Sequence, residues 1–171
     1  ALAERISGDT TLGHSLAYCQ AVESLSNIQV PRRARFLRSL FLELERLHNH
    51  IGDVGGICND TAYALAHAHC GRLKERVMQL NDRLTGSRFL RRVNCVGGVG
   101  IDLSTDQISG LVTELDTIEK DFSELEQIIA VNASLIDRFE STGILKKHTA
   151  WDHGVVGVVG RASGIDRDLR R

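Results

Sequence analysis

The chain has 171 residues, of which 42% are hydrophobic, and its 21 Lys and Arg residues nearly balance its 22 Asp and Glu residues to give a formal net charge of -1. This balance argues against a nucleic-acid or anionic-membrane partner, and the size fits one globular domain with a single core. The chain begins without methionine and has no run of about 20 apolar residues, so we expect a fragment of a longer protein that does not itself span a membrane.

Apolar residues recur at steps of three and four through most of the chain, which is the period of amphipathic helices. We predict a first helix from the polar residues at 9–11 to about Asn27, and a second from Pro31 to about Cys58. The second helix has its polar residues, including Arg38 and Glu45, on the side opposite the apolar ones. For Arg38 and its neighbouring arginines we favour a solvated helix face over a phosphate or acidic-partner site. Glycines at 52, 55 and 56 predict a kink or a close backbone approach near its end.

A third helix is predicted from Asn59 or Asp60 to Gly86, followed over 87–103 by a turn with one or two short strands. Ser104 and Gln107 have the spacing of a capping box and predict a fourth helix to about Ser141. Within it, Asn132 is interpreted as a polar residue that fixes the helix register. Residues beyond Gly143 are rich in glycine and predict loops or short strands. The expected fold is mainly α, a single long-helix bundle over residues 1–171 with short β segments.

The beginning of the chain carries its most specific motif. Residues 4–18 read E-R-I-S-G-D-T-T-L-G-H-S-L-A-Y, and A-V-E follows at 21–23. This segment resembles the metal-site region of [NiFe] hydrogenase large subunits, where the pattern is E-R-I-C-G-I-C-x-x-x-H-S-x-A-Y-x-x-x-V-E. The match resumes at 43–50 (E-L-E-R-L-H-N-H), at 84–86, at 97–99 and at 161–168 (R-A-S-G-I-D-R-D). It is closest to the membrane-associated group 4 hydrogenases and to the related 49-kDa subunit of respiratory complex I, and it implies their long-helix bundle.

One departure from the hydrogenase pattern concerns the metal ligands. Ser7 and Thr10 stand where the hydrogenases place their first two nickel-binding cysteines, whereas His14 keeps its place. A hydroxyl oxygen is hard and stays protonated near neutral pH, so it does not replace a soft thiolate as a nickel ligand. We therefore expect no metal in this pocket.

The resemblance to complex I implies a quinone-binding cavity in place of the nickel site. Tyr18 matches the tyrosine that approaches the quinone head group, and Asp60 matches the aspartate that partners a proton-delivering histidine. That histidine would lie upstream of Ala1 and is not His14. A phenol can donate a hydrogen bond or a proton to a quinone oxygen as negative charge develops there. We assign catalytic roles to Tyr18, Asp60 and His14.

Ser7, Thr10, Arg161 and Asp168 are assigned binding roles, the last two because they lie in a glycine-rich loop that matches both families. Structural alternatives remain open. A tyrosine on an apolar helix is commonly a core residue, an aspartate at a helix start is commonly an N-cap, and Arg161 and Asp168 equally fit a structural ion pair.

As a hypothesis, the full protein is the 49-kDa-like subunit of a membrane-associated, complex I-like oxidoreductase. The alternatives are a true group 4 hydrogenase large subunit and a non-catalytic scaffold. The resemblance implies a quinone for the complex, an iron–sulfur cluster on a partner small subunit, and membrane antiporter-like partner subunits. The four widely spaced cysteines are expected to be reduced and to hold no cluster. We expect a location at the cytoplasmic, inner face of the cell membrane, reached through the partner subunits. The piece alone is expected to bind no cofactor and to be inactive.

Overall fold

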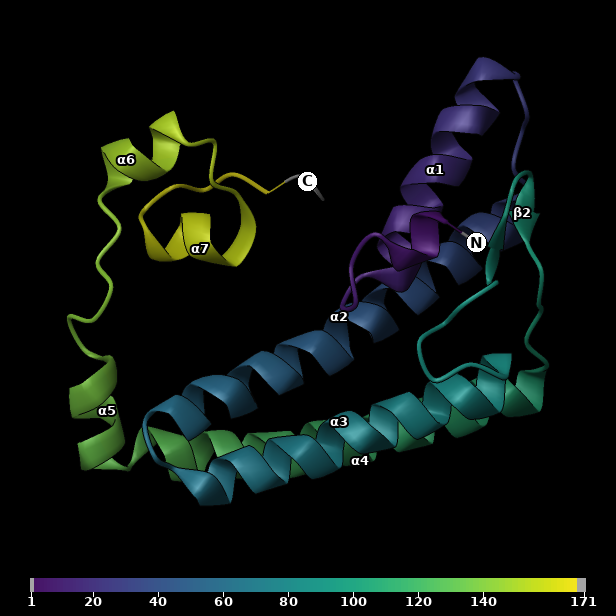
Figure 1. The fold of residues 1–171 in the computed structure, drawn as a ribbon. Helices are drawn as coiled ribbons and strands as arrows, with labels where there is room; N and C mark the ends of the chain where they lie inside the picture. Colours follow the sequence, from purple (N-terminus) through teal and green to yellow (C-terminus); the bar gives the residue numbers. More distant parts are fainter. Residues whose placement is uncertain (1, 169–171) are drawn as a thin grey trace. The chain divides into compact units, whose positions relative to one another are not determined.

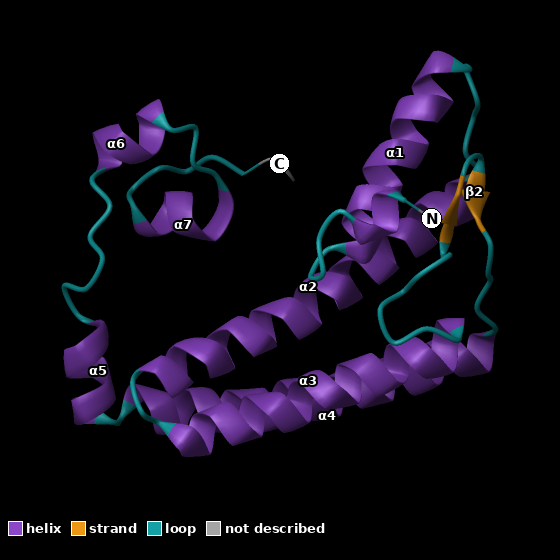
Figure 2. Ribbon diagram, viewed as in Figure 1, coloured by secondary structure: helices purple, strands orange, loops and turns teal. Residues whose placement is uncertain are grey.

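The computed structural model describes residues 2–168, and its regular secondary structure is almost entirely helical (Figures 1 and 2). Its elements are the short 3-10 helix η1 (Ala3–Arg5), α1 (Thr11–Leu25), α2 (Arg32–Asp60), α3 (Ala64–Thr85), β1 (Asn94–Cys95), β2 (Gly98–Val99), α4 (Thr105–Ala130), α5 (Ala133–Phe139), α6 (Lys147–Asp152) and α7 (Gly157–Ala162). The mainly α fold with short strands is confirmed. The described chain forms two compact units that divide between Val131 and Asn132.

The two long helices α2 and α3 form the most extensive packed pair of the first unit. They approach closely at Gly55, where an added Cβ would lie 2.7 Å from the Cβ of Cys70. The close approach predicted from the glycines is therefore confirmed at this position. The fully buried side chains of Cys58 and Cys70 continue this contact.

The predicted start of the third helix at Asn59 or Asp60 is wrong. The α2 helix continues to Asp60, and the chain then reverses through Ala62, which has a φ of 62°. The α3 helix begins at Ala64 with Tyr63 at its N-cap. Asp60 is therefore not a helix cap, because the backbone reversal lies after it and not before it.

The hydrophobic core of the first unit lies where α1, α2, α3, the loop after α3 and α4 meet. Its buried members are Leu12, Leu37, Phe41, Leu44, Leu80, Leu90, Val93, Leu103 and Leu111. Most of the apolar positions that predict α2 and α3 are buried there or along the α2–α3 contact. The burial removes each of these side chains from water and stabilises the fold by roughly 1.5–3 kcal/mol per large side chain.

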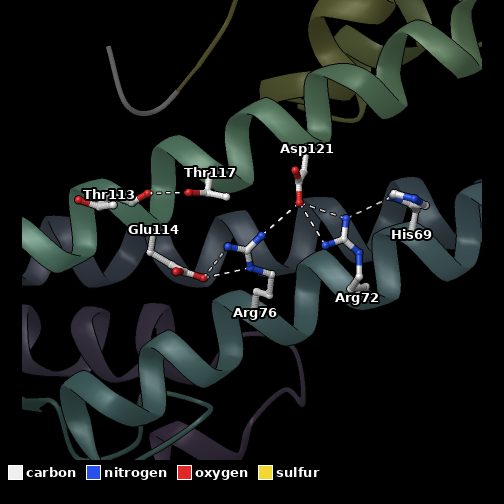
Figure 3. Close-up of polar contacts among 7 residues, drawn as sticks. All are labelled: His69, Arg72, Arg76, Thr113, Glu114, Thr117 and Asp121. Carbon is white, nitrogen blue, oxygen red and sulfur yellow. Dashed lines mark hydrogen bonds and ion pairs between the residues drawn. The ribbon is translucent and has the colours of Figure 1, made fainter.

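Helix α4 is held to α3 by a network of charged side chains (Figure 3). Arg76 contacts Glu114 at 3.0 Å and Asp121 at 3.1 Å, and Arg72 also contacts Asp121 at 3.1 Å. Shared partners make this a network, which contributes more than isolated surface pairs do. Because these side chains are all engaged with one another, we assign the network to helix packing.

The capping box predicted at the start of α4 is confirmed. The Ser104 hydroxyl accepts the Gln107 N–H at 3.2 Å, and the Gln107 side chain accepts the Ser104 N–H at 2.9 Å. The predicted end at Ser141 is wrong, because α4 ends at Ala130. Asn132 caps the separate helix α5, since its side-chain oxygen accepts the Leu135 N–H at 3.1 Å. A side chain with this local bond favours a helix start over a position inside a helix.

The second unit contains α5, α6 and α7. The sequence-based expectation of loops or short strands after Gly143 is wrong, because two helices of six residues each form at 147–152 and 157–162. Gly154 and Gly157, with φ values of 64° and 70°, turn the chain between them. The sequence does not predict these helices, because each is less than two turns long and so has too few apolar repeats to show the helical period.

Candidate functional site

The candidate site is built around the loop at 6–10 and the first turn of α1. Thr10 is the N-cap of α1, but its side chain makes no capping hydrogen bond. The capping group is Glu45 from α2, whose carboxylate accepts the Leu12 N–H at 2.6 Å and the Gly13 N–H at 2.8 Å. The start of α1 is therefore fixed by a residue from another helix, which satisfies two backbone amides that the helix itself leaves unpaired.

Glu45 is a functional candidate that the sequence analysis missed. It lies on the polar side of α2 as predicted from the pattern, yet it is only 3% exposed. Burial raises its pKa above the ordinary value, while the N–H groups of α1 and the charge of His14 act in the opposite direction. His14, which the sequence predicts as a site residue, is therefore near enough to interact electrostatically with the Glu45 carboxyl group. Only the repeated acidic residues at 43 and 45 could have pointed to it.

The second half of α1 is held by a buried ion pair between Glu23 and Arg38. The two side chains form paired hydrogen bonds of 2.5 and 3.0 Å. Arg38 also donates to the carbonyl oxygens of Cys95 at 2.8 Å and Gly98 at 3.1 Å, and Glu23 accepts the Gly97 N–H at 2.8 Å. The guanidinium of Arg38 lowers the pKa of Glu23. The prediction of a solvated Arg38 is wrong, because this side chain joins α1, α2 and the β1–β2 hairpin and is 3% exposed.

Ser7, Thr10 and His14 lie close along the chain at this end of α1, and all three are partly buried. The Ser7 hydroxyl accepts the Asp9 N–H at 3.4 Å, and Asn49 of α2 donates to the Asp9 carbonyl oxygen at 2.6 Å. The loop is thus tied to α2 through its backbone. The Ser7 hydroxyl bonds within the loop itself, and the Thr10 hydroxyl does not cap α1.

Tyr18 lies one helical turn after His14 on α1, so the two side chains share a helix face. Tyr18 is 60% exposed, as is usual for a surface residue and not for a core residue. Leu25 extends the exposed apolar surface of α1, with 86% of its surface accessible. A helix that is apolar on several sides usually packs against more protein than it contacts here.

The structure does not bring Asp60 to this group. Helix α1 runs alongside the part of α2 between Arg38, which bonds Glu23, and Asn49, which bonds the loop before α1. Asp60 is the last residue of α2 and is exposed. At about 1.5 Å per residue, it lies about 16 Å of helix beyond Asn49.

Arg161 and Asp168 belong to the second unit, where they contact each other at 2.7 Å. The Asp168 side chain is 7% exposed and that of Arg161 36%. The Gly157 N–H also donates to the Arg167 carbonyl oxygen at 2.9 Å and closes the same loop. The ion pair that the sequence left open is therefore present, and the binding role of the two residues stays a prediction.

A polar pocket of about 360 Å³ opens beside the capped end of α1. It is lined by Asp9, Thr10, Leu42, Glu45, Arg46, Asn49, His50, Asp53 and Lys74. It therefore joins the loop before α1 to polar groups of α2 and α3. Within residues 2–168, no cluster of His, Cys, Asp and Glu side chains has the arrangement of a metal site. No helix of the described chain has the length and hydropathy needed to cross a membrane.

Comparisons with known proteins relate most of the chain to one family. Residues 64–171 match the family model described as the 49 Kd subunit of respiratory-chain NADH dehydrogenase. The chain is 32% identical over 169 residues to formate hydrogenlyase subunit 5 of Escherichia coli (strain K12), and the match covers 99% of this chain and 30% of that protein. It is 35% identical over 158 residues to an NADH-quinone oxidoreductase subunit of Clostridium beijerinckii, and the match covers 92% of this chain and 43% of that protein.

A solved structure has the same fold. A chain from the structure of the membrane-bound sulfane sulfur reductase, an archaeal respiratory membrane complex, matches with a TM-score of 0.81 and 25% sequence identity over 88% of this chain and 40% of that chain. This chain therefore spans less than half the length of each of these relatives.

Proposed function

Because this chain belongs to the family of the 49-kDa subunit of respiratory-chain NADH dehydrogenase, we propose that it is part of the large subunit of a membrane-associated, complex I-like oxidoreductase. In this proposal, the region at the start of α1 receives a quinone and not nickel. The observation that carries the proposal is the joint presence of Ser7 and Thr10 at the thiolate positions of the hydrogenase pattern and of Tyr18 at the tyrosine position of the complex I pattern.

The loss of two thiolates removes the chemistry on which nickel binding depends. Hydroxyl oxygens remain protonated near neutral pH and are poor ligands for a soft metal centre. The same oxygens can still donate hydrogen bonds to a carbonyl group of an organic substrate. Ser7 and Thr10 are therefore proposed as binding residues.

Tyr18 is proposed as the residue that donates a proton or a hydrogen bond to a reduced quinone oxygen. Its exposed phenol lies on the same helix face as His14, so a head group bound against this face would meet both side chains. His14 can then supply a replacement proton to the phenolate. Asp60 is too far along α2 to share this face, and any role of Asp60 would be separate. Arg161 and Asp168 would act by holding their loop in shape.

The relatives support a place for this chain in a larger assembly. They are named as subunits of quinone oxidoreductase and hydrogenlyase systems and as part of a respiratory membrane complex. We propose that the electrons reach the quinone from an iron–sulfur cluster on a partner small subunit. Association with antiporter-like membrane subunits would hold this chain at the inner face of the cell membrane.

The two alternative functions are a hydrogenase large subunit and a non-catalytic scaffold. A true group 4 hydrogenase would contain nickel in the full protein, and a scaffold would contribute no chemistry. Sulfane sulfur is a further candidate electron acceptor, because the structural relative is named as a sulfane sulfur reductase. These alternatives predict different results in one set of measurements.

The test uses the full-length protein in its native complex. We expect Tyr18→Phe to lower quinone reduction by at least about tenfold, because a general acid contributes roughly 10²–10⁴-fold. Tyr63→Phe is the matched control, since Tyr63 lies at the start of α3, and it should leave the rate unchanged. An unchanged rate in Tyr18→Phe would contradict the proposal and favour a scaffold. Stoichiometric nickel would favour the hydrogenase, and activity with polysulfide alone would favour sulfur reduction.

A further inference from the structure

The polar pocket beside α1 gathers several titratable groups from different segments of the chain. The titratable groups that line it with Glu45 are contributed by three segments: Asp9 from the loop before α1, Arg46, His50 and Asp53 from α2, and Lys74 from α3. Arg46 is engaged by Glu43 at 2.9 Å. The remaining groups face a cavity of about 360 Å³, which is large enough for several water molecules.

Glu45 stands between this cavity and the start of α1. It lines the cavity and is 3% exposed, while both of its carboxylate oxygens contact backbone amides of the first turn of α1. His14 follows one residue after Gly13 and interacts electrostatically with the carboxyl group. The buried carboxyl group therefore lies between the cavity and the proposed site.

The Lys74 side chain passes close to Gly52 of α2 and also lines the cavity. An added Cβ at Gly52 would lie 3.0 Å from the Lys74 Nζ and 3.2 Å from its Cδ. The glycine therefore lets this amine lie across α2 at the edge of the cavity. A cation at the rim would favour the ionised form of nearby carboxylates, so it would promote release of a proton that Glu45 holds.

We propose that Glu45 is the group through which protons pass from the polar pocket to His14, so that the proton donated by Tyr18 is replaced. This inference rests on the proposed function and adds to it the proton route. Glu45 does not contact the acceptor in this proposal but acts through His14.

The transfer conserves protons and charge at each step. A proton from pocket water binds one carboxylate oxygen of Glu45, and this oxygen exchanges its hydrogen bond with a backbone amide of α1 for an O–H donor. The O–H bond then breaks toward His14, which restores the carboxylate and its bond to the amide. His14 becomes the cation that reprotonates the Tyr18 phenolate. Burial makes the neutral carboxyl group accessible, because it raises the pKa of Glu45.

The first experiment measures the proton on Glu45 in the 171-residue chain, without any substrate. We expect the carboxyl carbon of Glu45, followed by NMR, to titrate above 4.5, the ordinary value for a glutamate. Glu43 on the exposed side of α2 is the internal comparison. His14→Gln should move the Glu45 midpoint upward, because the nearby cation that favours the carboxylate is gone. A midpoint at or below 4.5, or no response to His14→Gln, would overturn the inference.

The second experiment measures turnover in the native complex. Glu45→Gln keeps the size and one acceptor oxygen of the side chain, and we expect it to lower kcat at least tenfold, to leave KM unchanged and to remove a limb from the pH profile. Glu43→Gln is the control and should change none of these. An unchanged kcat and pH profile in Glu45→Gln, while Tyr18→Phe slows turnover, would refute the proton route alone. Unchanged turnover in both variants would refute the proposed function, and the NMR titration would still report on Glu45.

Discussion

Replacement of Arg38 by Met should destabilise the first unit strongly. The side chain donates to both carboxylate oxygens of Glu23 and to the carbonyl oxygens of Cys95 and Gly98, and it is almost completely buried. Methionine fills a similar volume but provides none of these donors. It leaves the carboxylate of Glu23 buried without its partner, and removal of one member of a buried pair costs about 3–5 kcal/mol.

The measurement is urea unfolding of the 171-residue chain, followed by circular dichroism. We expect the free energy of unfolding to fall by about 3–5 kcal/mol and the amides of the β1–β2 hairpin to lose protection from hydrogen exchange first. The matched control is Arg35→Met, since Arg35 is exposed on the same helix. A loss below about 1 kcal/mol, comparable to an exposed ion pair, would refute the view that this pair fastens the hairpin.

The dependence on pH provides a second check on the same pair. Arg38 lowers the pKa of Glu23 in the folded state below the ordinary 4.5, so the unfolded chain binds the proton more tightly. The pair therefore contributes its full stability above about pH 4.5, and this contribution is lost as the pH falls through the lower folded-state pKa. The difference in stability between the native chain and Arg38→Met should narrow in acid. A constant difference down to pH 2 would contradict this assignment.

Three other results are expected from the same chain. Gly55→Ala should lower the free energy of unfolding by about 1–3 kcal/mol, because the added Cβ would collide with Cys70. The control Gly56→Ala has open space around it and should be neutral or stabilising by up to about 1 kcal/mol. Equal effects of the two substitutions would exclude the collision. Ser104→Ala should cost about 1 kcal/mol in the same unfolding assay through loss of the capping box. A thiol reagent should modify the exposed Cys95 rapidly and the three buried cysteines only after unfolding, and rapid modification of all four would contradict their burial.

The long helices can be predicted from the sequence because their apolar residues repeat with the helical period over many turns. Ser104 can also be predicted because a capping box is a local pattern. The turn after Asp60 cannot, since it depends on a positive φ at Ala62, a residue type that rarely marks one. The helices after Gly143 escape prediction because fewer than two turns carry too little periodicity.

In the candidate site, too, features that depend on neighbouring residues can be predicted from the sequence, and features that depend on residues far apart in the chain cannot. The motif at 4–18 locates the loop and α1 directly. The burial of Glu45 and Arg38 is not visible in the helical pattern, because their partners lie 33 and 15 residues away in the sequence. Periodicity describes which side of a helix is apolar, whereas the burial of a charged side chain depends on the groups that the fold brings to it.

The cap that Glu45 supplies to α1 affects which residues the loop before α1 can tolerate. The first residues of a helix normally include a side chain that accepts a backbone N–H group, and this requirement limits which residues occur there. Here the capping carboxylate comes from another helix, so the side chain of the N-cap residue Thr10 is not needed to cap α1. A change of the side chain at position 10 therefore leaves in place the two hydrogen bonds that Glu45 makes to the first turn of α1.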